Sequence, residues 1–149
     1  MSKNKAGFTL IEIMIVVGVI LVIVALGLPS MLRSRMNANE LAAVAACRII
    51  SNACQLYYTN DLPHSFPEGL NNLALPDSDP PYIDSALASG QKQGYKFEYS
   101  FVNSEAFTLR ADPTRPGRTG ARYFFVDETG LIRAREGGQA GVDDKPVSD

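Results

Sequence analysis

The chain has 149 residues, with 14 lysines and arginines against 16 aspartates and glutamates, and a net charge of −2. Because the two signs are interspersed and nearly balanced, the composition excludes a strong electrostatic preference for nucleic acid or anionic lipid. The absence of Trp and the presence of a single His give no basis for an aromatic binding platform or a metal site.

An apolar run from Phe8 to Leu28 follows a short segment that holds Lys3 and Lys5. As a helix it is roughly 30 Å long, which matches the hydrocarbon core of a bilayer. We therefore predict a membrane-spanning helix over residues 8–28. Glu12 is the one acid inside it, and a charge near the centre of a membrane helix costs ~2.5–3.5 kcal/mol. The presence of Glu12 inside the apolar run therefore indicates that its carboxylate has a functional role.

The segment Lys5-Ala6-Gly7-Phe8-Thr9-Leu10-Ile11-Glu12 resembles the class III signal of type IV prepilins and type II secretion pseudopilins. The resemblance covers Lys3 to about Pro29. It implies that a prepilin peptidase removes a leader, residues 1–7, by cutting after Gly7, and then N-methylates Phe8. It also implies storage in the inner membrane with a periplasmic domain, followed by assembly into a cell-surface or periplasmic filament.

The spacing of Phe8 and Glu12 supports this interpretation. Cleavage after Gly7 frees a cationic amine at Phe8, and Glu12 lies about one helical turn, roughly 6 Å, further on. In a helical stack, each Glu12 meets the Phe8 amine of its own chain or of a neighbouring subunit, and an unpaired charge marks misregister. We therefore expect Glu12 to act in assembly; the alternative is that it extends to the lipid headgroups.

The N-terminus has two alternative interpretations. Ala25-Leu26-Gly27 has the pattern of a secretory cleavage site, which would release a soluble protein beginning near Leu28. The apolar run is longer than the 7–15 residues of a removable signal core, and such cores rarely carry an acid. The other is a plain signal anchor, whose orientation the flanking charges should set. The two lysines before the run are balanced by Arg33 and Arg35, so the positive-inside rule decides little about orientation.

Gly18, Gly27 and Pro29 weaken an otherwise strongly apolar helix. Gly costs ~1 kcal/mol and Pro ~3 kcal/mol relative to Ala in a helix interior. Filaments of the resembled family locally unwind this stretch, so we expect a helical or merely kinked segment in the membrane and a partly unwound one after polymerisation. The alternative is that Gly18 only permits close packing and Pro29 only bends the chain.

An amphipathic helix is predicted over residues 29–58, with a broad apolar arc. Cys47 and Cys54 lie on it seven residues apart, ~10.5 Å along an intact helix, beyond the ~7 Å limit for a disulfide. We predict two buried free thiols. Many type IV pilins carry a disulfide near the C-terminus, and this chain has no cysteine after Cys54. That favours pseudopilins or simpler pilin-like subunits.

Residues 59–94 are rich in Pro, Asp and Asn and are predicted to form a long loop. A period of two then indicates antiparallel strands over residues 95–101, 107–112, 122–127 and 131–135, followed by a disordered tail over 136–149. The predicted fold is α+β: a long N-terminal α-helix, membrane-spanning in its first half, packed on a four-stranded antiparallel sheet that occupies residues 95–135. It is similar to the pilin globular domain.

The predicted function is structural: a subunit of a type IV pilus-like filament, without a cofactor or metal. A Cys–His dyad is disfavoured because His64 lies in the loop and both thiols on a helix. Asp143 and Asp144 are too few ligands for a calcium site. Nucleic-acid binding is not predicted either, because late arginines are matched by acids. These acids and arginines are Arg110, Arg115, Arg118, Arg122, Arg133, Arg135, Glu98, Glu105, Asp112, Asp127, Glu128 and Glu136.

Two alternatives stay open at this point: a type II secretion pseudopilin, and a monomeric membrane-anchored or secreted binding domain. The expected partners are the prepilin peptidase, the inner membrane before assembly, further copies of the chain and other pilin-like subunits. The sequence does not separate a pilus from a secretion system, nor a major from a minor subunit.

Overall fold

The computed structural model describes residues 7–60 and 64–147, with the backbone alone at position 28. The predicted leader lies outside these residues except for Gly7. The chain divides into two units, residues 1–34 and 35–149. Its elements are α1 (Leu10–Asn60), the 3₁₀ helix η1 (Leu70–Leu73), α2 (Ser85–Ala88), β1 (Gln91–Lys92), β2 (Tyr95–Asn103), β3 (Ala106–Pro113), β4 (Arg122–Asp127) and β5 (Arg133–Glu136).

The first unit consists of the beginning of α1 and the residues before it. Thr9 caps the helix, because its Oγ1 accepts the backbone N–H of Glu12 at 3.3 Å and its carbonyl accepts that of Ile13 at 3.3 Å. Pro29 lies inside the helix. Among the described residues, α1 is the helix that is long and apolar enough to cross a membrane.

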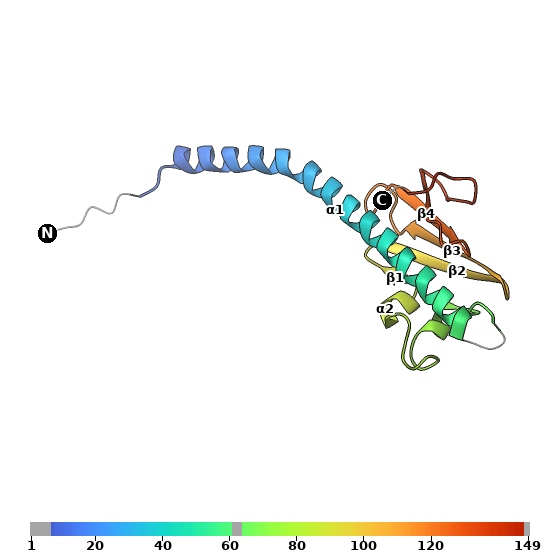
Figure 1. Cartoon of the computed structure of the whole chain (residues 1–149). Coiled ribbons are helices and arrows are strands. Elements are labelled where there is room, and N and C mark those ends of the chain that lie inside the picture. The colour runs from blue at the N-terminus through green and yellow to red at the C-terminus, as the bar shows by residue number, and fades with distance from the viewer. Residues whose placement is uncertain (1–6, 61–63, 148–149) are drawn as a thin grey trace. The chain divides into compact units, whose positions relative to one another are not determined.

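The second unit is an antiparallel meander in the order β1-β2-β3-β4-β5, with α1 lying across one face of the sheet (Figure 1). This confirms the predicted α+β fold, with five strands in place of the expected four. The additional strand is β1, in the segment predicted to be loop. Its turn to β2 consists of Gln93 and Gly94, with φ values of 46° and 78°, and two positive φ angles are what a tight hairpin requires.

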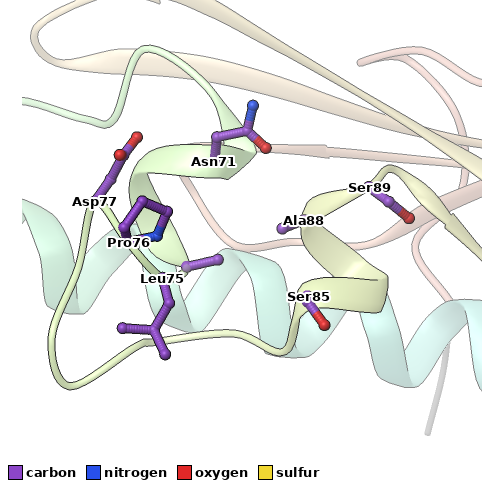
Figure 2. Close-up of a pocket in the computed structure, with 8 residues that line it drawn as sticks. Asn71, Leu75, Pro76, Asp77, Ser85, Ala88 and Ser89 are labelled. Atoms are coloured by element: carbon purple, nitrogen blue, oxygen red, sulfur yellow. The ribbon is translucent and has the colours of Figure 1, made fainter.

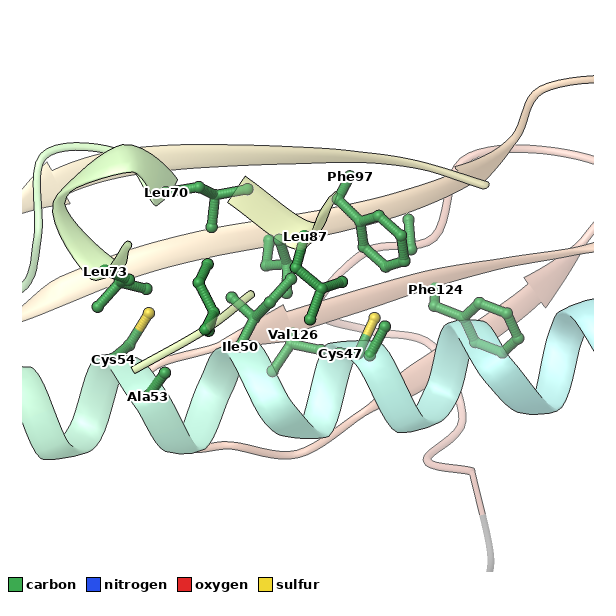
Figure 3. Close-up of a cluster of buried hydrophobic side chains, with 14 of the residues drawn as sticks. Cys47, Ile50, Ala53, Cys54, Leu70, Leu73, Leu87, Phe97, Phe124 and Val126 are labelled. Atoms are coloured by element: carbon green, nitrogen blue, oxygen red, sulfur yellow. The ribbon is translucent and has the colours of Figure 1, made fainter. Parts of the chain in front are cut away.

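The core lies between α1 and the sheet. The helix contributes small side chains, which let the two layers approach closely, and the sheet contributes large ones. Loop residues 64–94 close the remaining side with Phe66, Leu70, Leu73, Ile83 and Leu87. Figure 3 shows this packing around Cys47, Ile50, Ala53 and Cys54 of α1 and Phe97, Phe124 and Val126 of the strands.

The face of α1 that is buried is the one that carries the cysteines. Cys47, Ile50 and Cys54 are fully buried, whereas Leu41 and Leu56 stay 68% and 55% exposed. The broad apolar arc seen in the sequence therefore divides into a buried stripe and an exposed one.

The C-terminal segment differs from the disorder expected of residues 136–149. The backbone N–H of Ala134 donates to the Lys145 carbonyl at 3.0 Å, and that of Val147 to the Ile132 carbonyl at 2.8 Å. Residues 137–147 thus return to the edge strand β5, and the expected disorder is not found over them.

Polar bonds explain this order. The carboxylate of Asp144 accepts the Nε–H of Arg135 at 2.9 Å and the backbone N–H of Gly141 at 2.8 Å. Val147 also packs against the core, and Ala140 is buried. Because pairing with an edge strand uses backbone groups, the composition of the tail does not reveal it.

Candidate functional site

The N-terminal end of α1 holds the residues predicted for processing and assembly. Gly7 and Phe8 precede the helix, and the Phe8 side chain is 77% exposed. Glu12 lies in the first turn of α1. The helix cap provided by Thr9 therefore fixes the backbone between the proposed cleavage junction and the acid.

The apolar side chains of the first unit cover no core. The large apolar side chains between Leu10 and Leu26 are 47–78% exposed. Such a surface is disfavoured in water, and it suits contact with lipid or with other apolar helices.

The predicted flexibility positions are all inside the continuous helix. A Cβ added at Gly18 or Gly27 would meet nothing within 4 Å. The hydroxyl of Ser30 donates to the Gly27 carbonyl at 2.9 Å, so this backbone carbonyl accepts a side-chain hydrogen bond. The structure does not bring Gly18, Gly27 or Pro29 together with Glu12; they are distributed along one helix.

A polar clamp, made by Glu40 and Arg122, ties α1 to the sheet within the second unit. The Glu40 carboxylate accepts the Nε–H of Arg122 at 2.7 Å and the backbone N–H groups of Ala121 at 2.8 Å and Arg122 at 3.3 Å. Next to it, the Nδ2 amide of Asn39 donates to the Thr119 carbonyl at 2.9 Å. Burial alone raises the pKa of Glu40, but these hydrogen bonds outweigh it and hold the pKa below its ordinary value.

The two cysteines are inert groups of the core. Both are free and fully buried. Burial raises the pKa of each thiol to about 12. Since the thiolate is the reactive form, neither cysteine has the character of a nucleophile.

The other candidate residues have structural partners. His64 stacks on Tyr58 with ring centroids 5.6 Å apart, and its Nδ1 lies 2.9 Å from the Tyr58 carbonyl. Asp144 is bonded within the tail, as described above. Over residues 7–60 and 64–147, no group of three or more His, Cys, Asp or Glu side chains is placed to hold a metal ion.

The segment before the sheet contains a pocket of about 380 Å³ between η1 and α2 (Figure 2). Its lining is Asn71, Ala74, Leu75, Pro76, Asp77, Ser85, Ala88 and Ser89. One carboxylate among small and apolar groups offers no pair of acid and base, and we assign this pocket no chemistry.

Sequence reasoning missed the clamp. Glu40 stands among good helix formers, and nothing local distinguishes it from an exposed helical acid. Its partner is 82 residues away. A buried position within the helical pattern was the one available signal, because an acid on the core side of a helix needs a cationic partner.

Comparison with known proteins agrees with the N-terminal motif. Residues 2–28 match the family model described as the prokaryotic N-terminal methylation motif. The chain is also 29% identical over 97 residues to the type II secretion system core protein G of Escherichia coli (strain K12), and the match spans 63% of each protein. No significant match was found among solved structures. The predicted prepilin-type signal and methylation segment is therefore confirmed, and with it the similarity of the chain to a type II secretion pseudopilin.

Proposed function

We propose that the protein is a structural subunit of a pilin-like filament, assembled through its N-terminal helix after removal of residues 1–7. The observation that carries this proposal is the methylation motif over residues 2–28, which lies on an apolar helix with its side chains exposed. A helix of this kind needs lipid or other helices around it. A filament subunit uses both in succession.

Glu12 gives the assembly its register. Cleavage after Gly7 creates a cationic amine at Phe8, about one turn from Glu12. In the apolar core of a filament, an uncompensated charge is strongly unfavourable. Pairing of Glu12 with the Phe8 amine of a neighbouring subunit therefore favours one axial position over others.

The second unit supplies a folded domain and, in this proposal, no catalysis. Its buried acids Glu40 and Asp127 are bonded to Arg122 and Arg133, respectively, at 2.7 and 2.8 Å. These pairs connect the helix to the sheet and β4 to β5. Their partners leave them no role as an acid or base.

In this proposal the protein passes from the inner membrane to a filament. A prepilin peptidase cuts the leader at the inner membrane, the helix holds the subunit there with the domain in the periplasm, and assembly transfers it to a filament with further copies and other pilin-like subunits. The exposed apolar face of the first unit supports membrane storage.

A type II secretion pseudopilin is the second candidate within this proposal, beside a pilus subunit. The specific observation in its favour is the match over 97 residues to core protein G, which extends well beyond the 27 residues of the methylation motif. The test is complementation: the chain is expressed in cells that lack this core protein but retain the rest of the secretion system, and export is measured.

The assembly proposal is tested with Glu12→Gln in the full chain, expressed with its assembly machinery. The substitution removes the charge and keeps the shape. We expect normal membrane levels and loss of sheared filaments, as seen by electron microscopy. Ile13→Gln is the matched control, because it places the same amide in the same turn and leaves Glu12 intact. Normal filaments from Glu12→Gln would contradict the pairing, and failure of both variants would show sensitivity to polarity alone.

A further inference from the structure

The two ends of α1 within the second unit carry opposite unpartnered charges. At the first end is the arginine loop, residues 114–120, which joins β3 to β4. Arg115 and Arg118 are exposed there, and neither side chain has a hydrogen bond or ion pair with the described part of the chain. At the other end, Asp77 and Asp79 are exposed and equally without an ionic partner among the described residues.

The arginine loop is held rigidly. The backbone N–H groups of Arg118 and Thr119 donate to the Arg115 carbonyl at 3.0 and 2.9 Å, and that of Thr114 donates to the Gly94 carbonyl at 2.9 Å. Asn39 of α1 binds the Thr119 carbonyl. Two long cationic side chains thus project from a backbone that loses little entropy when they bind.

The opposite end holds a pocket of about 290 Å³, here called the tyrosine pocket. It is lined by Tyr57, Asn60, Asp77, Ser78, Asp79 and Tyr82. The two tyrosine rings meet edge to face, with centroids 6.1 Å apart and planes at 69°. The Nδ2 amide of Asn60 donates to the Tyr82 hydroxyl at 3.2 Å, which fixes that ring at the wall of the pocket.

This lining fits a guanidinium group. Aromatic rings attract a cation to their faces, and a carboxylate accepts two parallel N–H groups of an arginine. Two tyrosines and two aspartates around one pocket supply both interactions. The tyrosine pocket is therefore complementary to the arginine loop in charge and in chemistry.

The two sites cannot meet within one molecule. Asn39 contacts the arginine loop and Asn60 lines the tyrosine pocket, and these residues are about 31 Å apart along α1 at ~1.5 Å per residue. That separation far exceeds the reach of an arginine side chain. An arginine of this loop can therefore enter the tyrosine pocket only of another molecule.

We propose that the arginine loop of one subunit inserts Arg115 or Arg118 into the tyrosine pocket of another copy of the chain. The inference rests on the proposed filament function and names a contact between the domains of its subunits. The contact is heterologous, so each copy offers one loop and one pocket, and an open helical array forms where the rotation between copies does not close a ring. Paired copies are displaced by about 30 Å along the α1 direction of the second unit.

A membrane surface is the other acceptor for the loop. Recognition of anionic lipid is typical of clusters of four to eight basic residues. Two arginines fall short of such a cluster, and lipid gives the tyrosine pocket no role. A second copy of the chain accounts for both features.

Charge reversal with rescue tests the contact in the full chain, expressed with its assembly machinery. Arg115→Glu with Arg118→Glu, and separately Asp77→Arg with Asp79→Arg, should each reduce sheared filaments by about tenfold or more, because like charges then face each other. Combining all four substitutions should restore filaments, because the charge pair is re-formed in reverse. The matched controls Arg110→Glu and Glu128→Arg change exposed charges outside both sites and should assemble normally.

Each outcome is decisive. Normal assembly of either one-sided variant, or a combined variant that assembles no better than they do, overturns the contact while the filament function stands. Loss of filaments in the arginine variant with normal filaments in the aspartate variant assigns the loop to another acceptor, such as anionic lipid, instead. A wild-type chain that forms no filament overturns the proposed function, and the contact with it.

Discussion

The Nε–H of Arg122 donates to the carboxylate of Glu40 at 2.7 Å, although 82 residues separate the two in the sequence. The guanidinium also lies 5.5 Å from the centroid of the Phe124 ring, at a distance where a cation is attracted to an aromatic face. Helix, strand and core are thus joined at one point, close to where α1 enters the second unit.

Glu40→Gln should lower the free energy of unfolding by roughly 1–3 kcal/mol, because the buried bonds of the clamp lose their charge and Arg122 keeps only part of its bonding. Urea unfolding of the detergent-solubilised full chain, followed by circular dichroism, measures this. Glu98→Gln removes a carboxylate of a fully exposed pair with Lys96 and should leave the free energy of unfolding unchanged. Equal stability of wild type and Glu40→Gln would contradict the clamp.

The same pair predicts a pH dependence. The pKa of Glu40 is lower in the folded state than its ordinary value of 4.5. Its contribution is therefore fully present above pH 4.5 and is lost as the pH falls through the lowered pKa. Wild type should lose more stability than Glu40→Gln on acidification below that pH. Parallel acid profiles of the two proteins would show that Glu40 contributes nothing to this dependence.

The sequence predicted the parts of the fold that repeat locally. Alternation in 95–101 and 107–112 identified β2 and β3, and the helical pattern identified the second half of α1. The strand β1 was missed because Gln93-Gly94 is a weak hairpin signal compared with Asn-Gly or Asp-Gly. The tail was missed because its order comes mainly from bonds with β5 and within the tail, and the packing of Val147 and Ala140 is too little apolar burial to stand out in the sequence.

The candidate sites also divide into those made by neighbouring residues, which the sequence reveals, and those made by distant residues, which it does not. Gly7, Phe8 and Glu12 belong to one short motif and can be recognised in the sequence. The Glu40–Arg122 pair joins distant segments and has no local signature. The sequence also showed late arginines balanced in number by late acids. Folding places Arg115 and Arg118 at one end of the α1 segment in the second unit and Asp77 and Asp79, which lie outside that count, at the other.

The buried thiols should be unreactive in the native protein. A pKa of about 12 in place of 9.0 lowers the thiolate fraction about a thousandfold. We expect Cys47 and Cys54 to react with an aromatic disulfide reagent only after unfolding in urea, as followed by absorbance of the released thiolate. Rapid reaction of either thiol in the folded chain would contradict its burial.

Processing should produce a mature chain that begins at N-methylated Phe8. Intact-mass measurement and N-terminal sequencing of protein from the membrane fraction test this directly. Gly7→Ala should be processed more slowly and Gly7→Asp not at all, because a bulkier or charged junction fits the peptidase site less well. A mature terminus near Leu28 would establish secretory cleavage and would contradict the prepilin-type route.

The helix between Gly18 and Pro29 should change on assembly. It is continuous in the single chain, and a Cβ at Gly18 or Gly27 meets no neighbour within 4 Å. Gly18→Ala with Gly27→Ala should therefore leave membrane levels unchanged while stabilising the helix by ~1 kcal/mol per residue. If the segment partly unwinds in the filament, this stabilisation opposes assembly, and fewer filaments should form. The control is Leu21→Ala with Val24→Ala, which changes two residues of the same helix and leaves both glycines in place.

A cryo-EM map of the filament decides the question, because continuous helical density from Gly18 to Pro29 would contradict unwinding and leave the assembly role of Glu12 untouched.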